Sequence, residues 1–231
     1  MATPVTAVVC CKMLRRLLKS LILDPPTDSA RSCASMQSKR PSAHYEFRVN
    51  DEPVLVADLV GNPSRLLDYY LRLDDLSCCS VLGGYIIYAD GQVAMGETDE
   101  VSMSQTWLPA IIRLQCGEDR VSVWPWEESS MTLTRKGNLV QLEDVNSSGT
   151  VVCAKVQFAF DDFVRAMIDA SRPMAAFVSE FHSAIAHYQS SPPFSEDAEA
   201  TERLQFLNEE FSSEWSDWVT ESENLLNNEA T

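Results

Sequence analysis

The succession of predicted elements indicates an α+β protein: a single domain with an antiparallel or mixed sheet of hairpin-linked strands, helices packed on one face, and a C-terminal acidic amphipathic helix. Strand patterns follow one another in pairs, unlike the strict strand–helix alternation of a doubly wound parallel sheet. A chain of 231 residues that is 45% hydrophobic is long and apolar enough for one independent core.

Four strands and two helices are predicted in the first half of the chain. Alternating or short apolar patterns give strands at 45–49, 54–60, 85–88 and 93–95, and helical spacing gives helices at 63–77 and 103–114. Asn62 is expected to cap the first helix, because the proline that follows it needs no N–H there. The Asp90-Gly91 pair favours a tight hairpin turn. Pro109 is expected to bend or restart the second helix.

Four further strands and a long helix are predicted in the second half. The strand patterns lie at 121–126, 131–133, 139–142 and 151–160. Asp161 or Asp162 is expected to cap the helix, whose apolar stripe runs from Phe163 to Tyr188. Pro173 lies inside this pattern and is expected to divide the helix into two parts.

Charge divides the chain into three segments. Residues 1–42 hold seven basic and two acidic residues and end in a proline- and serine-rich stretch, so we predict a disordered N-terminal extension and linker. A non-structural extension, a loosely held amphipathic helix and a targeting sequence are all compatible with it. Residues 43–190 are predicted to form the α+β domain. Residues 191–231 hold eleven acidic residues and one arginine, and are predicted to form the acidic helix.

The sequence lacks the motifs of common catalytic and cofactor sites. It has no glycine-rich phosphate loop, no H-E-x-x-H and no G-x-S-x-G, and its three histidines do not stand at ligand spacing. We therefore predict no catalytic residues, no metal and no cofactor. Gly83-Gly84 is expected to serve a turn or close packing. Seven cysteines, with two adjacent pairs, indicate a reducing compartment and a cytoplasmic location, and Cys116 is predicted to be a small buried residue.

The sequence Trp124-Pro125-Trp126-Glu127-Glu128 has two interpretations. Its tryptophans and carboxylates would suit the rim of a site for a small ligand or a basic peptide. Alternatively, Trp124 and Trp126 face the core from one side of a strand, and Glu127 and Glu128 mark the exit of a hairpin.

An apolar stripe runs through the acidic C-terminal segment, for which Ser195 is the expected N-cap. Its members are Leu204, Leu207, Phe211, Trp215, Trp218 and Leu225. The stripe either packs on the domain in cis or docks in the groove of a partner, with Phe211, Trp215 and Trp218 as anchors.

The net charge of −16 disfavours nucleic acid and anionic lipid as partners, and no apolar run is long enough to cross a membrane. We therefore predict a non-catalytic intracellular binding or regulatory protein whose acidic surface engages a basic protein. The candidate partner-binding residues are Phe211, Trp215, Trp218, Trp124, Trp126, Glu127 and Glu128. In size, charge and lack of catalytic motifs the chain is similar to bacterial immunity proteins and other inhibitors of basic enzymes, although it shares no motif with them. The alternative is a small enzyme that uses carboxylates in a cleft near Trp124 to Glu128.

Overall fold

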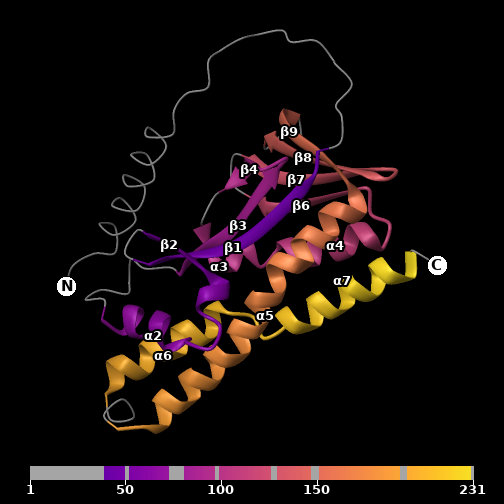
Figure 1. Cartoon of the computed structure of the whole chain (residues 1–231). Helices are drawn as coiled ribbons and strands as arrows, with labels where there is room; N and C mark the ends of the chain where they lie inside the picture. Colours follow the sequence, from indigo (N-terminus) through magenta and orange to yellow (C-terminus); the bar gives the residue numbers. More distant parts are fainter. Residues whose placement is uncertain are drawn as a thin grey trace. The chain divides into compact units, whose positions relative to one another are not determined.

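The strands that the structure describes form two antiparallel sheets, which helices accompany (Figure 1). The computed structural model describes residues 39–49, 52–72, 81–96, 99–125, 129–146, 151–192 and 197–229. The predicted α+β class is confirmed. The hairpin-linked strands divide between two sheets, where the sequence predicted one, because consecutive strands pair only within each half of the chain.

The first sheet has the strand order β2-β1-β3-β4, and β5 pairs with β3 outside this path. Its strands are β1 (Pro41–Val49), β2 (Glu52–Leu55), β3 (Leu82–Ala89), β4 (Gln92–Gly96) and β5 (Asp99–Glu100). Tyr45 and Phe47 of β1 and Tyr85 and Ile87 of β3 are buried, and these four side chains are the contribution of the two central strands to the hydrophobic core. β1 begins at Pro41, which lies opposite Ala89 of β3.

Gly83 lets two aromatic rings lie directly against the backbone of β3. It is opposite Phe47 in the sheet, and a Cβ atom there would lie 2.9 Å from Phe47 Cδ1 and 3.1 Å from Tyr45 Cε1. Gly83 therefore has the close-packing role that the sequence predicted for it.

Replacing Gly83 by alanine is expected to lower the free energy of unfolding by about 1–3 kcal/mol, because two packed rings would have to move. Gly96→Ala is the matched control, since the added methyl meets only the side-chain ends of Ile86 and Val93. Urea denaturation of both variants measures the difference. A Gly83→Ala protein as stable as Gly96→Ala would contradict this packing.

The second sheet is a meander in which each strand pairs with the next, in the order β6-β7-β8-β9. Its strands are β6 (Arg120–Pro125), β7 (Ser129–Lys136), β8 (Leu139–Asn146) and β9 (Val151–Ala159). Val123, Leu133, Leu142 and Phe158 are fully buried on its inner face. The turn between β7 and β8 places Gly137 at φ 63°, which glycine adopts without strain.

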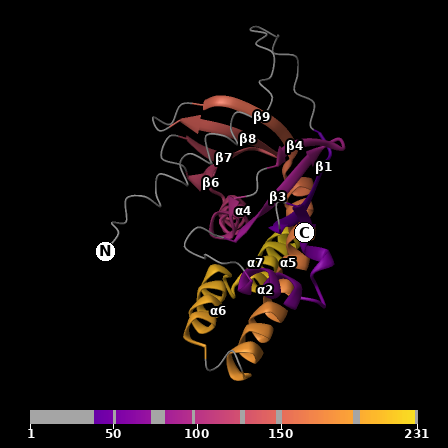
Figure 2. The same ribbon diagram turned by 90° about the vertical axis from the view of Figure 1, so that its left-hand side faces the viewer.

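The helices lie against the two sheets and against one another (Figure 2). They are η1 (Val56–Asp58), α2 (Ser64–Leu71), α3 (Val101–Ser104), α4 (Trp107–Gln115), α5 (Phe160–Ser190), α6 (Ala198–Glu210) and α7 (Trp215–Glu229). α5 packs on β1, α6 and α7, while α4 packs on β6 and α7. One hydrophobic core therefore includes side chains from both sheets and from the C-terminal helices.

α5 is one continuous helix of 31 residues, so the expectation that Pro173 divides it is wrong. Ile168 and Ala170 before the proline and Met174 and Phe177 after it are all buried, and this packing keeps the helix continuous through Pro173. The expected cap is also wrong. Ala159 is the N-cap, and Asp161 and Asp162 occupy the first turn, where their negative charge favours the helix dipole.

Three smaller expectations also differ from the structure. α2 begins after Pro63 and ends at Leu71, and the Asn62 side chain accepts a hydrogen bond from Ser64 Oγ without capping the helix. The break between α3 and α4 falls at residues 105–106 and not at Pro109. Pro109 lies in the first turn of α4, where proline is tolerated. Cys116 is exposed at the end of α4 and is not a buried residue.

Candidate functional site

The acidic C-terminal segment forms two helices, α6 and α7, where the sequence predicted one. The side chain of Gln105 holds the break: its Nε2 donates to the carbonyl of Glu210 (2.9 Å), and its Oε1 accepts from the backbone N–H of Ser212 (2.6 Å). The first cap also differs, since Asp197 accepts from the N–H groups of Glu199 and Ala200, and Ser195 lies outside the described residues.

The apolar stripe of these helices packs in cis. Phe211 is 2% exposed, and its ring contacts those of Phe47, Phe177 and Phe181. Trp215 is 1% exposed and meets the ring of Tyr45 edge-on. Phe211 and Trp215 are therefore core residues and offer no surface to a partner in this conformation.

Trp218 differs from its two neighbours in the stripe. Its ring lies 5.7 Å from that of Trp215, and the residue is only partly buried. Of the three expected anchors, Trp218 is the one that remains accessible.

A buried polar pair and a surface ion pair fix the rotation of α7 about its axis. Gln115 Nε2 donates to the Ser222 carbonyl (2.9 Å), and Ser222 Oγ donates back to Gln115 Oε1 (2.7 Å). On another side of α7, Glu223 accepts from Arg172 of α5 at 2.8 Å. The sequence contains no local signal for these contacts, because their partners are more than 50 residues apart.

What we call the acidic stripe consists of Glu214, which directly precedes α7, and of Asp217 and Glu221 on the outward face of α7. Their spacing of three and four residues places them on one side of the helix, and all three are exposed. Among the residues that the structure describes, none of the three carboxylates has a cationic partner. The partly buried Trp218 lies beside the stripe, four residues after Glu214 and three before Glu221.

The second group of expected site residues is not described in atomic detail. Trp124 is in β6, with its side chain outside the described part of the structure, and Trp126, Glu127 and Glu128 lie outside the described residues. The ligand rim and the carboxylate enzyme that these residues suggested stay predictions.

Two buried tyrosines are the titratable groups with the largest change of environment. Tyr45 hydrogen-bonds Ser104, and the Tyr85 hydroxyl lies 2.6 Å from Ser171 Oγ. Burial raises the pKa of both phenols far above the usual value, and their serine partners lower it only in part. Both hydroxyls therefore stay neutral, and their hydrogen bonds are satisfied inside the core.

Within the described part of the chain, no three His, Cys, Asp or Glu side chains are grouped so that they would hold a metal ion. No helix in that part has the length and apolar character needed to span a membrane.

Comparison with known proteins adds no identification. No family model, no curated protein and no solved structure matches this chain.

Proposed function

We propose that this protein is a non-catalytic, cytoplasmic binding or regulatory protein that engages a basic protein partner through the acidic stripe of α7. The observation that carries the proposal is the stripe itself: Glu214, Asp217 and Glu221 are exposed and have no cationic partner among the described residues.

Helix stability explains only part of the acidic stripe. Like charges three or four residues apart on a helix repel each other, at a cost of about 0.2–0.5 kcal/mol per pair. The helix dipole offsets this cost near the N-terminus of α7, where Glu214 and Asp217 lie. Glu221 lies beyond the first turn, where the helix dipole stabilises a negative charge only weakly. A basic partner would neutralise all three carboxylates.

Trp218 supplies the apolar part of the proposed contact. Tryptophan is enriched among the residues that dominate binding energy at interfaces, whereas surface charges mainly steer association. Trp218 is partly exposed beside the stripe, so a partner would reach it together with the carboxylates. This arrangement favours a protein ligand over a free cation.

The test removes the three charges and compares the result with a charge-matched control. The stripe variant is Glu214→Gln, Asp217→Asn, Glu221→Gln. The control is Glu52→Gln, Asp119→Asn, Glu202→Gln, three exposed carboxylates outside α7 that also lack a cationic partner among the described residues. Affinity purification with the full chain identifies the partner, whose association rate with each protein is then measured at low and at physiological salt.

We expect the stripe variant to associate about tenfold or more slowly at low salt, while the control stays close to the original protein. The difference should shrink as salt screens the charges. Equal rates for the two variants, or a partner without a basic surface, would contradict the proposal.

A further inference from the structure

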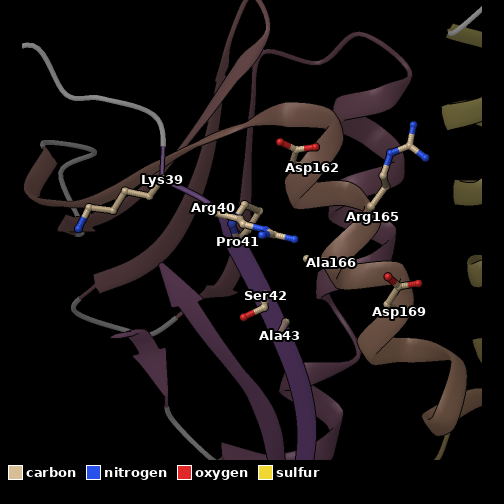
Figure 3. Close-up of a pocket in the computed structure, with 9 residues that line it drawn as sticks. All are labelled: Lys39, Arg40, Pro41, Ser42, Ala43, Asp162, Arg165, Ala166 and Asp169. Atoms are coloured by element: carbon tan, nitrogen blue, oxygen red, sulfur yellow. The ribbon is translucent and has the colours of Figure 1, made fainter. Parts of the chain in front are cut away.

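An open cavity lies between the start of β1 and the N-terminal half of α5 (Figure 3). Its volume is about 640 Å³, within the range typical of sites for small molecules. Residues 39–43 form one wall, and Asp162, Arg165, Ala166 and Asp169 form the other. The cavity shares no residue with the acidic stripe.

Three cations line this cavity in a protein whose net charge is −16: Lys39, Arg40 and Arg165. Within the described part of the chain, none of the three side chains takes part in an ion pair. By contrast, Arg113, Arg172 and Arg203 each pair with a carboxylate.

Arg40 is the best placed of the three cations. Its backbone N–H donates to Asp90 Oδ1 at 2.9 Å, which fixes the start of the strand without using the guanidinium. Figure 3 shows the Arg40 side chain extending from β1 toward Ala166 of α5. The guanidinium therefore lies between the two walls, and no residue of the described ranges pairs with it.

The two acidic lining residues differ in their state. Asp169 pairs with Arg172, which also pairs with Glu223, so the charge of Asp169 is compensated only in part. Asp162 has no cationic partner among the described residues, and its negative charge would repel an anionic ligand in the cavity. The Arg40 guanidinium lies between the walls, whereas the Lys39 and Arg165 side chains line the edges of the cavity and extend away from Arg40, so their charges reach a ligand by rotation of these long side chains (Figure 3).

We propose that this cavity binds a small molecule that carries a phosphate group. Guanidinium groups bind phosphate oxygens in a bidentate manner, and a lysine adds a mobile point charge. Pro41, Ala43 and Ala166 provide apolar surface for the rest of the molecule. Asp162, an acceptor only, would bind a hydroxyl or amino group of that molecule.

Inorganic pyrophosphate is the probe for the phosphate group, titrated into the full chain without divalent cations at physiological salt. Calorimetry gives the affinity, and amide NMR shifts give the location. The variants are Arg40→Gln and Asp162→Asn. Arg120→Gln and Asp119→Asn make the same charge changes at exposed positions outside the cavity.

We expect saturable binding of one pyrophosphate, with shifts at the amides of Ser42, Ala43 and Ala166. Arg40→Gln should weaken binding about tenfold or more, and Asp162→Asn should tighten it several-fold, while both controls stay within twofold. Citrate, an anion of similar charge that carries carboxylates, should bind more weakly.

The proposal is overturned by the absence of binding at millimolar pyrophosphate, by shifts confined to residues 1–38, or by equal effects of Arg40→Gln and Arg120→Gln. Tighter binding of citrate would overturn the assignment to phosphate. Because no variant touches α7, these outcomes are independent of the test of the acidic stripe.

Discussion

Replacing Trp215 by alanine is expected to lower the free energy of unfolding by about 3–5 kcal/mol, the usual cost of deleting a buried tryptophan side chain. Trp215 is 1% exposed and contacts the rings of Tyr45 and Trp218 in the core. Urea denaturation followed by far-UV circular dichroism measures this loss.

Two further variants test whether the loss of stability comes from the buried volume of the Trp215 ring. Trp218→Ala should cost clearly less, because this side chain is only partly buried. Trp215→Phe should cost less than Trp215→Ala, because phenylalanine leaves a smaller cavity in the core. The indole N–H that it removes has no hydrogen-bond partner in the described structure, so no group is left unpaired. A Trp215→Ala protein of unchanged stability would show that the apolar stripe of the C-terminal helices is not part of the core.

A chain that ends at Pro192, and so lacks α6 and α7, is expected to lose cooperative unfolding. The two helices contribute buried side chains to the same core as Phe47, Phe177 and Phe181; these are Leu204, Leu207, Phe211, Trp215, Val219 and Leu226. Their removal would expose a continuous apolar surface on the first sheet and α5. Broad thermal transitions and strong binding of a hydrophobic dye are the expected observations.

A chain that ends at Asn227 is the control, because it keeps Leu226, the last buried side chain of the core among the described residues. It should unfold in one sharp transition, close to that of the full chain. A sharp transition in the chain that ends at Pro192 would contradict the shared core and would make the C-terminal helices an independent unit.

Local patterns were sufficient to predict the class of the fold and most strands. Alternation predicted β6 to β9, and the Asp90-Gly91 pair predicted the β3–β4 hairpin, where Asp90 and Gly91 both have positive φ. The errors have tertiary causes. Packing on both sides of Pro173 keeps α5 continuous, and the amide of Gln105 ends α6 where the sequence continues its helical pattern.

The cavity residues show the same limit for function. Lys39 and Arg40 belong to a segment whose composition indicated a linker, and Arg165 lies more than 120 residues away on a helix face. Nothing in either local pattern points to the other. By contrast, the excess of acidic residues in the C-terminal segment was visible in the sequence. Which of its side chains face outward became clear only from the structure, in which Phe211 and Trp215 are buried.

The shared core also sets the order in which the chain can complete its fold. Tyr45 and Phe47 leave the ribosome early, but the rings that cover them, Trp215 and Phe211, are made about 170 residues later. At about 5–20 residues per second, this delay is roughly 10–30 s. Throughout that time the nascent protein carries an uncovered aromatic surface. A chaperone that binds such surfaces during translation is therefore expected to associate with this chain until α7 is released.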